Sequence, residues 1–203
     1  METFINSSCC PFIKDVFTVL ISAGVLLVAW KGLETWKAQI KGVKTYEIAY
    51  NLNYAILKLR NAIRHVRNPA IWPSESYKAV QYAKAKYPDK NPEEIEKDSG
   101  SYVYEMRWEE IKNASTEVDS HLLGAEVLWG KEILELMKPL NKKITELNIA
   151  LQQKFNPDLR TKSSTEIFNI VYEGGESSEK DTFSKEVNSA VQQITDYIKS
   201  KLS

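Results

Sequence analysis

Val16 to Trp30 form the run VFTVLISAGVLLVAW, which carries no charged side chain in an otherwise charged sequence. Apolar surface of this density is stable only in lipid or in a protein core. At 1.5 Å per residue the run spans about 22 Å, whereas the hydrocarbon layer of a bilayer is about 30 Å thick. Extension to Leu33 adds only Lys31 as a charge, and a lysine at a helix end can reach the headgroups. We therefore predict a transmembrane helix over residues 15–33.

Other interpretations of the run stay open at this point. A buried core helix, or a segment lying in the membrane interface, would also be apolar. A cleaved signal peptide is less favoured, because the preceding METFINSSCCPFIKD carries Glu2 and Asp15 and bulky residues follow the run. The spanning interpretation assigns the lipid contacts to side chains along the run, namely Val16, Leu20, Leu26, Leu27 and Trp30.

Lysines flank the run unevenly. Four follow it, whereas Lys14 alone precedes it and is offset by Asp15. Because positive charge collects on the cytoplasmic side of spanning helices, we expect residues 1–14 outside and the C-terminal part in the cytoplasm. Lysine and tryptophan beside a membrane contact lipid headgroups. The expected contacts are Lys31, Trp36, Lys37, Lys41 and Lys44.

Composition places limits on the rest of the chain. About 170 residues follow the span, enough for one helical domain with its own core. Basic and acidic side chains balance at 27 each, so nucleic acid is possible as a partner but not favoured. The only cysteines, Cys9 and Cys10, are adjacent and precede the span. Adjacent cysteines rarely bridge each other without strain, and inert thiols are favoured over a cross-link between two copies.

Apolar residues continue at helical spacing after the run, with no proline before Pro69. They form two series with steps of three and four residues: Leu33, Trp36, Ile40 and Val43, then Ala49, Leu52, Ile56, Leu59, Ile63 and Val66. This spacing predicts one helix from the bilayer to about Arg67, with an apolar face for partner helices. Gly32 and Gly42 are its possible weak points, and Asn68-Pro69 ends it.

Two further segments precede the C-terminal part. A shorter helix is expected over residues 74–86, followed by an acidic connector over 87–100 that proline interrupts. A second long helix begins near Ser101 and reaches Asn156-Pro157, because apolar residues keep the same spacing. We expect Pro139 to kink or reset this helix.

The C-terminal residues carry clear helix signals. Ser163 and Glu166 form a capping box that opens a short helix, which Gly174-Gly175 closes. A terminal helix is marked by Phe183, Val187, Ala190, Ile194 and Ile198. The predicted fold class is all-α, with an N-terminal transmembrane helix that continues into a cytoplasmic antiparallel helical bundle. In this organisation residues 34–158 form the bundle of long helices, and residues 159–203 form short helices that pack on it.

Charge suggests how the long helices pair. Residues 31–67 hold eight basic and two acidic side chains, whereas residues 89–110 hold eight acidic and three basic ones. Two such helices packed antiparallel would neutralise each other, which sets partner choice more than stability. Arg60, Arg64 and Arg67 share one face, and a phosphate-binding stripe is the less favoured interpretation of that face.

The sequence offers no pattern of an enzyme. Its only histidines are His65 and His121, and neither zinc spacing nor a phosphate-binding glycine loop is present. Glu117 and His121 stand four apart on a helix, where we expect a solvated pair rather than a metal site. We therefore expect no catalytic, metal or cofactor site. Five aromatic residues are expected in helix–helix cores: Tyr46, Tyr50, Tyr54, Trp108 and Trp129.

Several stretches resemble small single-pass bacterial inner-membrane helical proteins of largely unknown function. The resemblance lies in Trp30-Lys31-Gly32-Leu33, Thr35-Trp36-Lys37, Tyr46-Glu47 and Val66-Arg67-Asn68-Pro69, and near the end in Asp181, Phe183-Ser184, Glu186, Ala190 and Ile194. Some proteins of this layout accompany anti-phage modules, including retrons, as membrane-acting effectors. The resemblance implies a bacterial inner-membrane location and a non-enzymatic, membrane-perturbing effector.

An alternative is a passive membrane-tethered adaptor for a cytoplasmic protein. Such an adaptor would bind its partner through the apolar face that holds Leu59 and Ile63. An effector would instead act on the lipid bilayer by self-assembly, for which Ser22, Ala23 and Gly24 supply small residues in the span.

Overall fold

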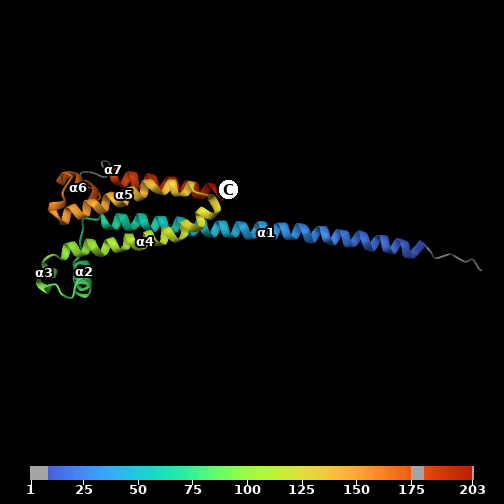
Figure 1. The fold of residues 1–203 in the computed structure, drawn as a ribbon, viewed down its shortest axis with the longest axis horizontal. Coiled ribbons are helices and arrows are strands. Elements are labelled where there is room, and N and C mark those ends of the chain that lie inside the picture. The colour runs from blue at the N-terminus through green and yellow to red at the C-terminus, as the bar shows by residue number, and fades with distance from the viewer. Residues whose placement is uncertain (1–8, 175–180, 203) are drawn as a thin grey trace, which may run out of the picture. The chain divides into compact units, whose positions relative to one another are not determined.

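The computed structural model describes residues 9–174 and 181–202, with the side chains of residues 15–174 and 181–202. Every regular element in these ranges is a helix, so the all-α prediction is confirmed (Figure 1). In chain order the elements are α1 (Cys9–Val66), α2 (Pro73–Lys86), α3 (Pro92–Lys97), α4 (Ser99–Trp129), α5 (Glu132–Phe155), the 3-10 helix η1 (Pro157–Leu159), α6 (Ser164–Val171) and α7 (Thr182–Ser200).

The chain forms two compact units, Met1–Tyr46 and Glu47–Ser203. The first contains the N-terminal part of α1, and the second contains the rest of α1 with all the other helices. As expected from its spacing, α1 continues past Gly32 and Gly42 and ends at Val66, just before Asn68-Pro69.

Within the second unit, α4 packs antiparallel to the C-terminal part of α1. The direction follows from three contacts, in which Ile48 lies against Gly124, Lys58 pairs with Glu117 and His65 pairs with Glu110. As the number rises along α1 it falls along α4, which confirms the predicted antiparallel bundle. Helices α5 and α7 complete this bundle (Figure 1).

The main core lies among α1, α4, α5, α6 and α7. All six members of the second apolar series of α1, from Ala49 to Val66, are buried in it. Leu59 and Ile63 are only 1% and 2% exposed, so the chain itself covers the face expected to bind an adaptor's partner. A smaller cluster joins α2, α3 and the start of α4, and consists of Ala79, Ala83, Ile95, Tyr102 and Val103.

The break between the long helices differs from the prediction. The chain turns at Gly130, where φ is 81° and ψ is −172°, a conformation that only glycine adopts without strain. Pro139, where we expected a kink or a reset of the helix, lies inside α5. Its missing N–H frees the carbonyl of Glu135, but both residues are exposed and water can satisfy that oxygen.

The acidic connector over residues 87–100 also contains a helix that was not expected. Asn91 caps α3, because its side-chain oxygen accepts a hydrogen bond from the N–H of Glu93 at 3.0 Å. Proline takes the first position of α3, where its missing N–H costs nothing. The proline that suggested a broken connector therefore begins a helix.

The capping box is confirmed, because Ser163 and Glu166 exchange hydrogen bonds at the start of α6. The helix ends at Val171, and Gly174 follows with φ at 73°. Gly175 lies outside the described residues. The five residues that marked the terminal helix are all buried on one face of α7.

Candidate functional site

The apolar run lies within α1 and has no cover from the chain. Of the described helices, α1 alone is long and apolar enough to cross a membrane, and none of its most apolar 18-residue window is buried. Exposure along the run reaches 70% at Leu26 and 73% at Val28. The chain therefore does not use this segment as its own core helix, and a membrane anchor is compatible with it.

The five residues predicted to contact lipid all lie exposed on α1. Val16 is 41% exposed and Trp30 is 67% exposed. The serine in the run does not disturb an apolar surface, because the Ser22 hydroxyl donates to the Thr18 carbonyl at 2.7 Å. A hydroxyl satisfied by its own helix avoids the cost of an unpaired polar group in hydrocarbon.

The C-terminal end of the run changes from apolar to charged within one turn. The indole N–H of Trp30 donates to the Glu34 carboxylate at 2.9 Å. An aromatic ring whose polar edge meets a charged group is typical of the membrane–water boundary. The contact lies close to residue 33, the predicted end of the span, and the position of that end remains a prediction.

The residues predicted to touch headgroups are exposed as well. Trp36 is 57% exposed. The four lysines, Lys31, Lys37, Lys41 and Lys44, are exposed, and no carboxylate of the described residues lies within 4.0 Å of their ammonium groups. These charges are available to an external anion, and their contact with lipid remains a prediction. The side chains of Cys9 and Cys10 lie outside the described residues.

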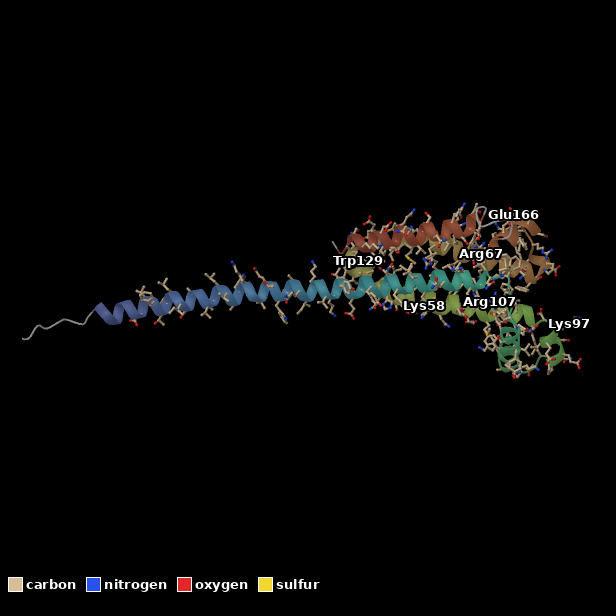
Figure 2. All side chains as sticks on the ribbon, turned by 180° about the vertical axis from the view of Figure 1, so that it is seen from behind. Lys58, Arg67, Lys97, Arg107, Trp129 and Glu166 are labelled. Atoms are coloured by element: carbon tan, nitrogen blue, oxygen red, sulfur yellow. The ribbon has the colours of Figure 1, made fainter. Side chains whose placement is uncertain are left out.

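Buried charge in the second unit centres on two arginines, and the first is Arg67. Its side chain is 1% exposed and donates to the carbonyls of Asn169, Ile170 and Tyr172 at 2.7–2.9 Å. These carbonyls lie at the end of α6, where backbone acceptors have no helical partner. Arg67, which follows the last residue of α1 and is labelled in Figure 2, therefore caps α6.

Asp181 completes the Arg67 site. Its two carboxylate oxygens accept from the guanidinium at 3.0 and 3.1 Å, and one accepts from the N–H of Ser184 at the start of α7. Burial works to raise the pKa of the Asp181 carboxyl, but the hydrogen bonds from Arg67 and Ser184 lower that pKa below its ordinary value. The carboxylate stays charged and joins α1 to α7.

The second buried arginine, Arg107, holds the chain where it leaves α1. It is 1% exposed and donates to the carbonyls of Asn68 and Ala70 at 2.6 and 2.7 Å. It also makes two hydrogen bonds to the Glu75 carboxylate, and these lower the pKa of Glu75 although burial works against them. Arg107 thus fixes the loop between α1 and α2 against α4 (Figure 2).

The arginine face predicted on α1 is divided between core and surface. Arg67 points inward, whereas Arg64 pairs with Glu173 at 3.3 Å. Arg60 and Arg64 line a cavity of about 260 Å³ beside Glu173, which places a carboxylate where a phosphate would have to bind. Internal pairing, the favoured interpretation, describes Arg64 and Arg67.

We predicted that the basic side chains of residues 31–67 would pair with the acidic side chains of residues 89–110. That prediction is largely wrong. Among the described residues, the pair that joins these two segments is His65 with Glu110, at 2.9 Å. The acidic side chains pair mainly with lysines near the end of α2 and with Lys112, in the contacts Lys84–Glu96, Lys86–Glu105 and Lys112–Glu109. Apolar burial therefore directs the antiparallel packing.

Aromatic residues divide between core and surface. Trp108 and Trp129 pack against the core as predicted. Tyr46, Tyr50 and Tyr54 do not, because each is at least 57% exposed. The prediction of a buried tyrosine series was wrong, since these residues lie on the opposite face of α1 from Leu52.

An apolar groove lies between the N-terminal half of α4 and the C-terminal half of α5. It has a volume of about 280 Å³ and is lined by Tyr104, Trp108, Leu151 and Phe155 among others. The ammonium group of Lys154 lies 3.8 Å from the centre of the ring of Tyr104, one of the lining residues.

Glu117 does not share a ligand with His121. Its carboxylate pairs with Lys58 at 2.5 Å, and this contact raises the pKa of the Lys58 ammonium group. Within residues 15–174 and 181–202 no group of three or more metal-binding side chains comes together.

Comparison of the chain with protein-family models, with curated proteins and with solved structures found no match. The site is therefore defined by its own geometry. The sequence did not predict that Arg107 and Glu75 pair. The only signal for such a pair was the excess of acidic residues in the segment around Arg107.

Proposed function

We propose that this protein is a single-pass membrane protein that holds its helical bundle at the cytoplasmic face of the bacterial inner membrane. We further propose that it acts there without catalysis, as a membrane-perturbing effector of an anti-phage, retron-type defence system. The observation that carries the proposal is the uncovered apolar run of α1, none of which the chain buries. Exposed apolar surface of this length requires lipid or another helix.

The charges beside the run support the orientation. Lys31, Lys37, Lys41 and Lys44 are exposed and have no carboxylate within 4.0 Å among the described residues. Each such charge gains about 1 kcal/mol beside an anionic leaflet, and this gain favours the cytoplasmic side.

The chemistry of the bundle supports a non-enzymatic role. The perturbed carboxylates Asp181 and Glu75 face buried arginines, and each of those arginines also donates to two or more backbone carbonyls. Perturbed carboxylates at an active site would face a cleft that a substrate can enter. These two serve to hold helices together.

Fractionation combined with growth tests the proposal. The full chain carrying Leu26→Arg is compared with Leu123→Arg, because Leu123 on α4 is 67% exposed and closely matches the 70% of Leu26. We expect wild type and Leu123→Arg in the membrane fraction, with loss of membrane potential and arrested growth on induction. Leu26→Arg should lose both effects, since arginine at the centre of a span costs about 3 kcal/mol or more. Recovery of the wild-type protein in the soluble fraction would contradict the proposed membrane anchor. Normal growth with an intact membrane potential would contradict the proposed effector role.

A passive adaptor is the second candidate, and the groove at Tyr104 and Phe155 favours it. Phe155→Glu places charge in the groove, and Ile149→Glu is the matched control because Ile149 is 42% exposed against 41% for Phe155. An adaptor predicts one stable partner in a pull-down of the full chain that Phe155→Glu loses and Ile149→Glu retains. Equal recovery from both variants would exclude the groove as the docking site.

A further inference from the structure

From the last residue of the predicted span onward, α1 carries an exposed apolar face that the bundle does not cover. We call Leu33, Trp36, Ile40 and Val43 the juxtamembrane stripe; they lie in the first unit and are 46%, 57%, 42% and 67% exposed. Four large apolar side chains on one face of a solvated helix indicate a partner.

The spacing of the juxtamembrane stripe identifies the kind of partner. Its members follow one another by three, four and three residues, and in the sequence the same alternation continues to Glu47, Tyr50 and Tyr54. An average step of 3.5 residues keeps one face of a helix against a second helix that winds around it. Leu33 and Ile40 then take the a positions of a heptad, and Trp36 and Val43 take the d positions.

We propose that the juxtamembrane stripe pairs with the same stripe of a second copy in a parallel two-helix coiled coil. This inference rests on the proposed membrane anchoring, because two copies inserted in one bilayer enter the cytoplasm side by side in the same direction. Confinement to the bilayer also raises the local concentration of each copy for the other, and a stripe too short to pair in solution can then pair.

The flanking residues select the parallel arrangement. In this heptad frame the e positions hold Lys37 and Lys44, and the g positions hold Gln39 and Tyr46. A parallel pair places g of one helix beside the following e of the other, so Gln39 faces Lys44 of the second copy. An antiparallel pair would place e beside e and bring lysines against lysines, which is unfavourable.

The lysines keep their predicted role in this arrangement. Lys31 and Lys41 take the f and b positions, on the outside of a coiled coil, where their charges can face lipid headgroups. Trp36 changes its role, since it packs against the second copy instead of against headgroups. Glu47 would occupy an a position, where a polar residue sets the register at a cost in stability.

Disulfide cross-linking in membranes tests the pairing. The full chain with Cys9→Ser and Cys10→Ser receives one new cysteine, either Val43→Cys at a d position or Ala38→Cys at an f position on the opposite face. Both positions are exposed on α1, so the two variants differ mainly in the helix face on which the new cysteine lies. Co-expression of two differently tagged copies identifies a dimer of this chain. We expect several-fold more mixed-tag dimer from Val43→Cys than from Ala38→Cys after mild oxidation.

The outcomes separate the inference from the proposal beneath it. Membrane-bound protein that stays monomeric at Val43→Cys, or that cross-links equally at both positions, overturns the pairing and leaves the anchor in place. An adduct of Val43→Cys with a different protein also overturns it, as does protection of that cysteine by lipid without a dimer. Protein found in the soluble fraction overturns the anchor itself, and the pairing with it.

Discussion

The two parts of α1 both carry large apolar side chains at helical spacing, but the burial of these side chains is opposite. Leu26 in the first part is 70% exposed, whereas Leu52 in the second part is fully buried against the rest of the bundle. The hydrophobic effect favours covering both, but only the second finds its cover within the same chain. One helix thus stabilises a folded domain at one end and leaves its apolar surface uncovered by the described chain at the other. The following predictions test that division, beginning with the largest effect.

Removal of the Arg67 side chain should lower the unfolding free energy of the bundle more than any other change that we propose. Arg67→Ala leaves Asp181 as a buried charge without its partner and uncaps α6, and breaking a buried pair in this way costs about 3–5 kcal/mol. Urea unfolding of the full chain in detergent micelles, followed by circular dichroism, measures the loss. Arg64→Ala is the control, because the Arg64 side chain is 75% exposed and its ion pair should contribute at most about 1 kcal/mol. Equal losses from the two variants would mean that the Arg67 site does not hold the helices together.

Truncation of one leucine on each part of α1 compares the parts directly. Leu52→Ala should cost about 2–5 kcal/mol of unfolding free energy, because it leaves a cavity in the core. Leu27→Ala, at a residue 68% exposed, should change bundle unfolding by no more than about 0.5 kcal/mol. The same urea titration measures both. A large cost at Leu27 would show that the bundle covers the anchor in solution, and the contrast between the two parts would fail.

The sequence predicted what depends on local signals. The steps of three and four along α1, the stop at Asn68-Pro69 and the capping box of Ser163 and Glu166 each act within a few residues, and each appears in the structure. The spacing could not show which apolar series the chain covers. Leu33 and Leu52 belong to similar patterns, and their burial depends on which helices return to pack there.

Tertiary contacts decided the remaining features. Arg67 and Asp181 are 114 residues apart in the sequence, and Arg107 lies 32 residues from Glu75, so no local pattern joins them. The sequence pointed to Pro139 as the place of a kink or reset and did not show that the chain turns at Gly130. A proline is tolerated where its freed carbonyl faces water, whereas a positive φ needs glycine.

A pair of glycine substitutions tests that explanation of the break. Gly130→Ala forces alanine into a conformation with φ at 81° and should destabilise the bundle by about 1–3 kcal/mol. Gly100→Ala, at the second residue of α4 with nothing within 4 Å of the added carbon, should stabilise it by about 0.5–1 kcal/mol. Thermal unfolding of the full chain in micelles should therefore move in opposite directions. A shift of the same sign for both would show that Gly130 is replaceable and that the turn has another cause.

Acid should lower the stability of the bundle because it protonates Asp181 and Glu75. This is the smallest effect we expect. Both carboxyls have a pKa below their ordinary values of 3.8 and 4.5 in the folded chain. As the pH falls, the unfolded chain binds protons first, so the stabilisation is complete above the ordinary pKa values and is lost below them. The effect is smaller than that of Arg67→Ala, because Arg67 keeps the three carbonyls at the end of α6 after Asp181 is protonated.

The slope of melting temperature against pH, between about pH 5 and about pH 3, measures this loss. Asp181→Asn should lower the melting temperature. It should also flatten the slope, because it removes one of the two carboxyls that titrate. Asp119→Asn, at an exposed position on α4, should leave the slope as it is in the wild type. Membrane association of α1 should not change over the same pH range, since its apolar run contains no group that titrates. Release of the chain from membranes at low pH would tie the anchor to the bundle and contradict the independence of the two parts.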